Sequence, residues 1–486
     1  MALSFAPTVR LAPALLGLTL LLSACGGDST PSGGGGGGGG GSTGCAAAQS
    51  LGQQNQSLAA PEALSAVTAF QTPAPDWSAP HVAGQVLLVG MQGGLSTQNL
   101  SAQNLSAQAA AALSGVQLQQ IDAELVLAYT PAGQNDQAFA SVLSQAGLRA
   151  QPNFIYEALA TPKDPGYPGN AGVRVGSGAY DQDYLTRINA ADGWNVAVAC
   201  GKTTSGVKTA VLDTGVDSAH PDLAGRLLAG KTFDSKGNMT NGAPEISTNE
   251  GDRGHGTGVA GLIGAATNNG VGLSGVTWQG QNILPLRVLG AQGSTSVALR
   301  AGLNYAVSQG AKVINMSLGY KTNPGDAALD TALTNAAKTA VLVAAAGNTS
   351  TDGIYYPASH PDVLAVGAVG KTNSLACYSA RAGAPSGSRQ LDLVAPGGNA
   401  GTGTATCYAS NPYDQLTLTT TDQGGYALRA GTSEAAPLVS GAAALVWNVK
   451  PSLSAAQVRN ILKTSATSVG GLKMLNVGAA VRAALK

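Results

Sequence analysis

Residues 207–217 read VKTAVLDTGVD, and this stretch decides the fold class. Its first part, residues 207–212, is a mostly apolar run that is typical of a strand buried on both faces of a parallel sheet. Asp213 follows directly, at the carboxyl end of the predicted strand, where sites gather in such sheets. Taken alone, the pattern fits a strand-end Asp that caps the following turn better than it fits a catalytic group.

The same pattern of apolar runs recurs through the second half of the chain, with helix-compatible stretches between the runs. Parallel strands need helical crossovers on both faces of their sheet. The alternation therefore predicts an α/β domain, a doubly wound and mostly parallel sheet, over residues 184–486. The further runs predicted as strands are residues 283–288, 312–316, 340–345, 363–369 and 391–394.

Two more polar motifs lie at the starts of predicted helices. Residues 254–261, GHGTGVAG, contain His255, one of only four histidines that could act as a general base. Residues 431–437, GTSEAAP, place Ser433 where unpaired N–H groups and the helix dipole favour developing negative charge. Pro437 is expected to be tolerated in the first turn of that helix. In isolation, each motif is more simply a structural His or an N-capping Ser.

A side-chain amide completes the set. Residues 344–348, AAAGN, end a predicted strand at Asn348, whose amide can donate a hydrogen bond to an oxyanion. The four groups occur in one domain in the order Asp, His, Asn, Ser. This order and these motifs resemble the subtilisin-like (subtilase) serine peptidases of family S8, over about residues 164–486.

The resemblance implies a secreted serine endopeptidase that hydrolyses polypeptide substrates through an acyl-enzyme on Ser433. His255 would take the proton of Ser433, and Asp213 would fix the tautomer of the imidazole. Asn348 and the backbone N–H of Ser433 would form the oxyanion hole. No cofactor takes part in this chemistry.

Two segments match the family's substrate-binding edges, with which a peptide pairs as an added strand. Tyr355 occupies a position near the base of the primary specificity pocket where small residues are common, so a shallow pocket is expected. Glu434 and Gly258 depart from a Met and a His that are common in the family, but neither position belongs to the triad, so activity is expected to survive. The two edges are Gly293, Ser294 and Thr295, and Ser317, Leu318 and Gly319.

The resemblance also implies a structural calcium site. Asp222, in the sequence HPDL, and Asn269, in the loop 267–273, resemble the family's calcium ligands. A carboxylate, an amide and loop carbonyls suit a hard cation. The alternative is a turn followed by an Asn-Gly loop.

A separate small domain is predicted over residues 81–160. It resembles the inhibitory, I9-like propeptide of the family, which implies an intramolecular inhibitor that is removed autocatalytically between about Ala160 and Asp164. Residues 161–183 are rich in Pro, Gly and Asp and are expected to form a linker and processing region. The elements of the small domain are expected in the order β-α-β-β-α-β of a ferredoxin-like α+β sandwich, over residues 82–89, 107–113, 116–121, 125–129, 134–148 and 154–159.

Residues 1–24 are predicted to be a lipoprotein-type signal peptide. Their apolar run, residues 11–22, is too short to span a bilayer, and the ending LSAC resembles a bacterial lipobox in which Cys25 is lipidated. The alternative is an ordinary signal peptide followed by a chance Cys. Residues 25–80 form a predicted Gly-rich tether and low-complexity linker. The chain is expected to be exported, as a cell-envelope lipoprotein or as an extracellular enzyme released by processing.

Four cysteines besides Cys25 remain for pairing in the oxidising compartment that export implies. Four cysteines allow three connectivities, and the sequence does not choose among them. The pair Cys377 and Cys407 is preferred because both lie in one stretch of the catalytic region.

The 26 basic and 26 acidic residues cancel, which removes the electrostatic case for binding nucleic acid or an anionic membrane surface. Membrane contact is expected only through the lipid, and a monomer is expected. Two other function classes compete. An anchored pseudo-protease would have no chemical reason to keep all four groups, and an esterase of the α/β-hydrolase kind needs Gly-x-Ser-x-Gly with a different chain order.

Overall fold

The computed structural model describes residues 74–77, 81–90, 105–122, 124–154, 161–202, 204–246, 253–382, 389–398 and 414–486. The predicted signal peptide, Cys25 and most of the tether lie outside these residues and stay predictions. Within the described ranges, no helix combines the length and the apolar character needed to cross a membrane.

A ten-stranded sheet forms the centre of the large domain. Its strands are, in chain order, β7 (Thr209–Asp213), β8 (Lys231–Phe233), β9 (Met239–Asn241), β10 (Ile283–Arg287), β11 (Val313–Met316), β12 (Val341–Ala345), β13 (Val363–Val369), β14 (Leu393–Pro396), β17 (Thr467–Val469) and β18 (Leu472–Met474). The spatial order is β17-β18-β14-β13-β12-β11-β7-β10-β8-β9, parallel except for antiparallel pairs at the two edges. The central strands are buried at every position, as their apolar sequences predicted.

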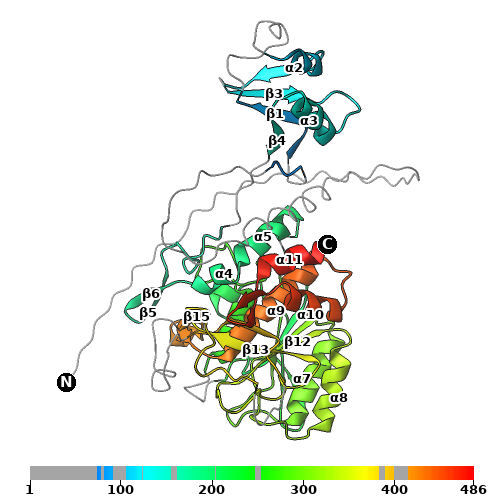
Figure 1. Cartoon of the computed structure of the whole chain (residues 1–486). Helices are drawn as coiled ribbons and strands as arrows, with labels where there is room; N and C mark the ends of the chain where they lie inside the picture. The colour runs from blue at the N-terminus through cyan, green and yellow to red at the C-terminus, as the bar shows by residue number, and fades with distance from the viewer. Residues whose placement is uncertain are drawn as a thin grey trace, which may run out of the picture. The chain divides into compact units, whose positions relative to one another are not determined.

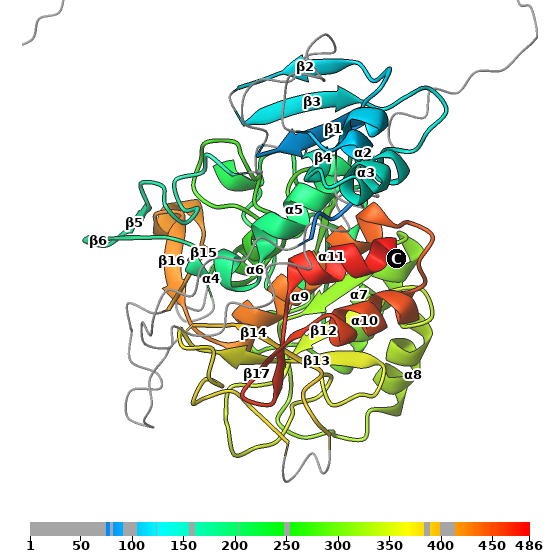
Figure 2. The ribbon, with the colours of Figure 1, turned by 45° about the horizontal axis from the view of Figure 1, so that its top comes forward.

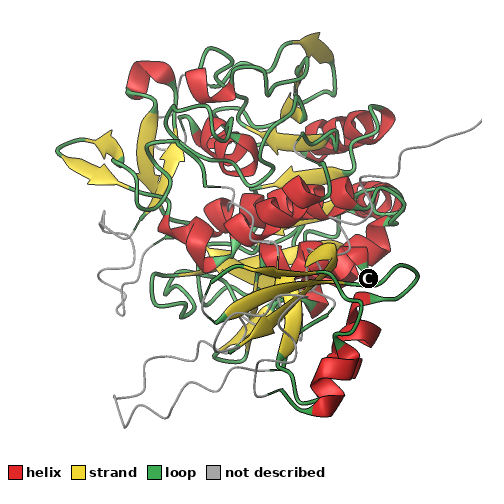
Figure 3. Cartoon of the chain, turned by 90° about the horizontal axis from the view of Figure 1, so that it is seen from above, coloured by secondary structure: helices red, strands yellow, loops and turns green. Residues whose placement is uncertain are grey.

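Helices cover both faces of this sheet (Figures 1 and 3). Successive side chains of a strand point to opposite faces, so Val341 and Val343 pack in one core and Leu342 and Ala344 in the other. This arrangement confirms the doubly wound α/β fold. One face carries α5 (Ala190–Ala199), α6 (His255–Gly264), α9 (Thr432–Val449), α10 (Ala455–Thr464) and α11 (Val477–Leu485), and the other carries α7 (Ser296–Ser308) and α8 (Ala327–Ala336).

The parallel pairing brings several polar groups to one edge of the sheet. Strands β7, β11 and β12 are parallel neighbours, so their carboxyl ends lie together. Asp213 ends β7, Ser317 follows β11, and Asn348 follows β12. Helices α6 and α9 begin at the same edge, because the crossover connections return there.

The small domain has the predicted order of elements, with antiparallel strands in the order β2-β3-β1-β4 (Figure 2). The strand that pairs with β1 is residues 150–154, so it begins four residues before the predicted fourth strand, 154–159, whose residues 155–159 lie outside the described set. The segment AQPNF has a Pro and little apolar alternation, which an edge strand tolerates and a sequence pattern misses. The elements are β1 (His81–Val89), α2 (Ala107–Ala112), β2 (Leu118–Gln120), β3 (Leu125–Tyr129), α3 (Asp136–Gln145) and β4 (Ala150–Phe154).

Residues 161–183, predicted to be a linker, have defined structure in the large domain. They form a hairpin of β5 (Val173–Val175) and β6 (Gly178–Tyr180), and Val173 packs in a core cluster with α6. Asp164 is fully buried because its carboxylate is bound by the loop that follows α6. The high Pro and Gly content of this segment reflects tight turns rather than a flexible connection.

Both cysteines in the described part of the chain take part in disulfides. Cys200 and Cys377 are each disulfide-bonded. Cys407 lies outside the described residues, so the pair of Cys377 with Cys407 stays a prediction.

Candidate active site

A hydrogen-bonded carboxylate and imidazole lie at the junction of β7 and α6. Asp213 is fully buried, and its Oδ1 accepts from His255 Nδ1 at 2.7 Å. The same oxygen accepts from Thr214 N at 2.8 Å and from Thr214 Oγ1 at 3.2 Å. Because Nδ1 donates to Asp213, the other ring nitrogen of His255 is left to act toward the groove.

Opposing effects set the pKa of His255. Burial lowers this pKa, while the charge and hydrogen bond of Asp213, and then the charge of Glu434, raise it. Arg429 opposes the increase, and the resulting pKa is about 9. His255 is therefore a stronger base than a free imidazole, and it is protonated over much of the neutral range.

Ser433 lies in the first turn of α9, and Pro437 helps to place it. The expectation that Pro437 falls in the first turn is wrong, because the helix begins at Thr432 and Pro437 lies in its second turn. Pro437 has no N–H to donate to the carbonyl of Ser433. Ser317 Oγ donates to that carbonyl instead, at 2.9 Å, and Ser433 Oγ donates to the Ser317 carbonyl at 3.3 Å.

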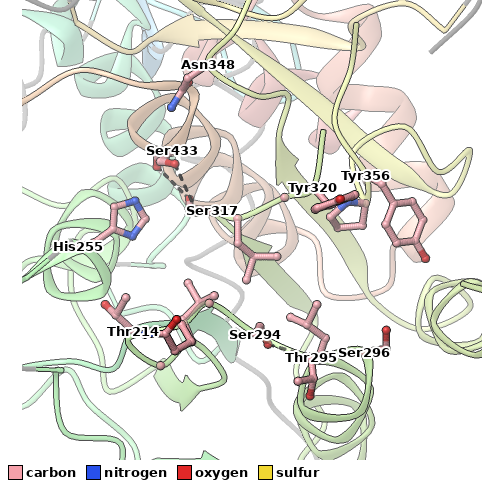
Figure 4. Close-up of a pocket in the computed structure, with 18 of the residues that line it drawn as sticks. Thr214, His255, Ser294, Thr295, Ser296, Ser317, Tyr320, Asn348, Tyr356 and Ser433 are labelled. Carbon is pink, nitrogen blue, oxygen red and sulfur yellow. Dashed lines mark hydrogen bonds between the residues drawn. The ribbon is translucent and has the colours of Figure 1, made fainter. Parts of the chain in front are cut away.

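His255 and Ser433 line the same groove (Figure 4). Within the described residues they share no hydrogen bond, because Ser433 Oγ points to Ser317. Catalytic hydrogen bonds are often long or unformed in enzymes without substrate and tighten on binding. His255 and Ser433 therefore line the same groove but are not hydrogen-bonded to each other.

The side-chain amide of Asn348 lies in the groove that His255 and Ser433 line. Its Oδ1 accepts from Thr432 N at 2.8 Å and from Thr432 Oγ1 at 2.9 Å. Since a backbone N–H can only donate, these bonds identify the oxygen and fix the orientation of the amide. Figure 4 shows the amide nitrogen directed toward Ser433.

The groove has a volume of about 940 Å³ and runs away from Ser433 between two segments. These are the two predicted edges, residues 293–295 and 317–319, all of which line it. The two segments thus line one groove together with His255 and Ser433, although they are far apart in sequence.

Tyr355 is not among the residues that line the groove, and its ring lies against the backbone beside it. A Cβ on Gly347 would lie 2.3 Å from Cδ1 of Tyr355, and a Cβ on Gly319 would lie 3.2 Å from its Cβ. Its hydroxyl is hydrogen-bonded to Thr349 and Asp352, both at 3.1 Å. The ring therefore fills the space between the segments that end at Gly319 and Gly347.

Two charged residues of the site were not predicted to be functional. Glu434, only 4% exposed, and Arg429, from β16 (Tyr426–Arg429), line the groove beside His255 and Ser433. Burial raises the pKa of Glu434, while the charges of His255 and Arg429 lower it. The signal that could have identified them is their closeness in sequence to Ser433, since Glu434 lies inside the serine motif and Arg429 two residues before it.

Asn269 lies on the loop after α6, and this loop is bound by two carboxylates from earlier segments, Asp164 and Asp222, the latter in the short helix Pro221–Leu223. The Asp164 carboxylate accepts from the N–H groups of the loop residues 268–270 and from Ser274 Oγ. Asp222 Oδ2 accepts from a loop N–H at 2.8 Å, but its Oδ1 is buried and has no hydrogen-bond partner within the described residues. Burial is the largest cause that raises the pKa of Asp222 to about 7.

The oxygen atoms of this site are compatible with a cation, although few of them belong to acidic side chains. The described residues contain no group of three or more His, Cys, Asp or Glu side chains that could hold a metal ion. The buried, unpartnered Oδ1 of Asp222 nevertheless is an oxygen of the kind that a hard cation prefers. Asp164 was not predicted to be part of this site, because it was expected to lie in a linker.

Comparison with known proteins agrees with this geometry. Residues 204–478 match the model of the subtilase family. The chain belongs to the subtilase family. As a subtilase it is a serine-type endopeptidase that acts on polypeptides, which confirms the resemblance seen in the motifs.

Individual subtilases resemble this chain over the large domain. Subtilisin Savinase from Lederbergia lenta is 41% identical over 280 residues, which cover 57% of this chain and 90% of that protein. Alkaline elastase YaB from Bacillus sp. (strain YaB) is 38% identical over 294 residues, which cover 59% of this chain and 68% of that protein. A solved structure of proteases from Pseudoalteromonas arctica PAMC 21717 matches with 29% identity and a TM-score of 0.53, over 67% of this chain and 100% of that chain.

Proposed function

We propose that Ser433 is the nucleophile of this subtilase, with His255 as its general base and Asp213 as the group that orients the imidazole. The observation that carries the proposal is the Asp213–His255 hydrogen bond of 2.7 Å in a groove that Ser433 also lines. In this mechanism the Ser433 side chain would rotate away from the Ser317 carbonyl so that its hydroxyl faces His255.

The reaction begins when Ser433 Oγ attacks the scissile carbonyl and His255 takes its proton. The carbonyl oxygen becomes an oxyanion that the amide of Asn348 and the N–H of Ser433 stabilise, aided by the N-terminus of α9. His255 then gives the proton to the leaving amine, and water hydrolyses the acyl-enzyme by the reverse route. Asp213 keeps the imidazole in the required tautomer throughout.

We infer that the substrate binds as an extended strand between residues 293–295 and 317–319. The lining of the groove by both segments supports this, because a peptide can pair with their backbone largely independently of its sequence. The residue before the cleaved bond is expected to be small, since Tyr355 fills the space beside Gly347. Small primary pockets are a property of elastases, and one of the similar proteins is an alkaline elastase.

We propose that the small domain is an inhibitory propeptide and that the mature enzyme begins between Ala160 and Asp164. Its βαββαβ order supports the proposal. Because Asp164 is buried by the loop after α6, we expect cleavage on its N-terminal side. We further propose that the chain is exported by its signal peptide, carries a lipid on Cys25, and acts as a monomer, tethered or released.

We propose a structural calcium ion held by Asp222 and Asn269, with loop carbonyls and Asp164 close by. The buried, unpartnered Oδ1 of Asp222 supports it, because such an atom is costly unless a cation or a donor satisfies it. Bound calcium would neutralise the charge of this site and stabilise the loop, and it would take no part in the chemistry.

The test is a maturation assay on the full chain without its signal peptide, as wild type and as Ser433→Ala. We expect the wild type to be trimmed between residues 160 and 164 and to digest casein, while the variant stays full length and inert. Mass spectrometry and casein hydrolysis give the two readouts. If neither protein is processed and neither cleaves casein in the presence of calcium, the catalytic roles assigned here are wrong.

A further inference from the structure

The helix that carries His255 begins without a capping side chain of its own. Its N-cap residue is Gly254, with φ of 76° and no side chain to accept from the first turn. An N-cap side chain normally accepts from the second or third N–H of a helix. In α6 these N–H groups belong to Gly256 and Thr257, so their acceptors come from elsewhere in the chain.

Two side chains from other segments supply these acceptors. Thr214 Oγ1 accepts from Gly256 N at 2.9 Å, and Glu245 Oε2 accepts from Thr257 N at 3.0 Å. Glu245 Oε2 also accepts from Thr257 Oγ1 at 2.8 Å. A carboxylate in this position interacts favourably with the helix dipole as well. Glu245 therefore replaces the missing cap of α6.

The same contacts reach the segment that carries Asp213. Thr257 Oγ1, which donates to Glu245, accepts from Asp217 N at 2.9 Å. Thr214 Oγ1, the other cap of α6, donates to Asp213 Oδ1 at 3.2 Å. The residues that hold the start of α6 thus also hold the end of β7.

The backbones of the three segments are in direct contact, so small displacements are transmitted. A Cβ on Gly215, which has φ of 107°, would lie 2.2 Å from the carbonyl oxygen of Pro244. A Cβ on Gly256 would lie 2.1 Å from the carbonyl oxygen of Gly215. The segment of Glu245 therefore packs on the loop after β7, and that loop packs on α6.

Glu245 is an unfavourable residue to bury here unless it has such a role. Burial raises its pKa, hydrogen bonding to Thr214 lowers it, and the neighbouring charge of Asp213 raises it again. A second carboxylate so close to Asp213 costs free energy, which the hydrogen bonds to α6 offset.

We propose that Glu245 is a positioning residue for the Asp213–His255 pair, because it holds the first turn of α6 against the segment after β7. In this role it fixes the place of the imidazole relative to Ser433. The inference rests on the catalytic roles proposed above for these three residues.

The kinetic test compares Glu245→Ala and Glu245→Gln with Ser454→Ala, all in the full chain that matures by itself. Ser454 caps α10 with a capping box, so its loss is a matched removal of a cap from another helix. With a chromogenic peptide, Glu245→Ala is expected to lower kcat by about 10- to 100-fold and to change KM less than about twofold. Glu245→Gln keeps one acceptor for Thr257 and is expected to lose only about 3- to 10-fold. Ser454→Ala should lose thermal stability but keep its kcat.

A second readout does not depend on activity. In a Ser433→Ala background, the proton that His255 Nδ1 shares with Asp213 gives a low-field proton NMR signal. Glu245→Ala should shift or broaden this signal, and Ser454→Ala should leave it unchanged. An inactive wild type would count against the catalytic roles, whereas this signal reports on Glu245 in either case.

The proposal is overturned if Glu245→Ala lowers kcat no more than Ser454→Ala and leaves the low-field signal in place. If Glu245→Ala does not fold, Glu245→Gln decides. A Glu245→Gln variant with the kcat and the signal of the wild type would equally overturn the proposal.

Discussion

Replacing Glu434 by Gln should move the acidic limb of the activity profile to lower pH. The pKa of His255 is about 9, and the charge of Glu434 is one of the causes that raise it. His255 accepts a proton only in its neutral form, so kcat/KM rises with pH through this pKa. At pH 7.5, a base of this pKa is about 3% neutral.

The size of the shift follows from the burial of Glu434 beside His255. The partly screened charge of Glu434 stabilises the imidazolium of His255 by roughly 1 kcal/mol. This corresponds to a shift of about 0.7 unit in the pKa of His255. Without the negative charge the imidazolium is less stable, the pKa of His255 falls, and about 14% of the base is neutral at pH 7.5. The variant should therefore be about fourfold faster than the wild type at pH 7.5 and equal to it well above pH 9.

The assay is kcat/KM for a chromogenic peptide from pH 6 to 11 at constant ionic strength. Asp234→Asn is the matched control, because it removes an exposed carboxylate that is hydrogen-bonded within its own turn. An acidic limb that stays in place in Glu434→Gln would show that Glu434 carries a proton in the free enzyme. A limb that moves to higher pH would refute the electrostatic reasoning altogether.

Three further predictions follow from the site. Asn348→Leu should lower kcat by about 100- to 1,000-fold with little change in KM, which is the loss found for an oxyanion-hole amide in subtilisin; a kcat within threefold of the wild type would remove Asn348 from the oxyanion hole. Tyr355→Gly should open the space beside Gly347, so that peptides with Phe before the cleaved bond gain at least about tenfold in kcat/KM relative to those with Ala; an unchanged ratio would show that the ring does not limit the pocket. Calcium at about 100 times its Kd should raise the Tm of the Ser433→Ala chain by about 5–10 °C in calorimetry. Asp222→Asn should abolish this rise, and an equal rise in both proteins would place the ion elsewhere.

Local patterns predicted the fold class and the core of the site. Apolar runs marked the central strands because strands buried on both faces cannot contain many polar residues. Asp213, His255 and Ser433 could be singled out only together, because their motifs and that of Asn348 occur in one domain in an order that resembles the subtilases. The bounds of strand β4 were not predicted correctly at its start, because an edge strand carries only a weak apolar signal. Residues 161–183 were predicted to be a linker because turns inside a domain have the same composition.

The sequence by itself determined the family of this protein and its α/β architecture, and it singled out the residues that we propose for acyl transfer, because these depend on local composition and on order along the chain. Tertiary structure alone decided which charges surround them. Glu245 caps α6 from a separate loop, Asp164 is buried by the loop after α6, and Ser317 takes the carbonyl that Pro437 leaves free. Each of these contacts joins segments that become neighbours only when the chain has folded, so no local pattern could contain them.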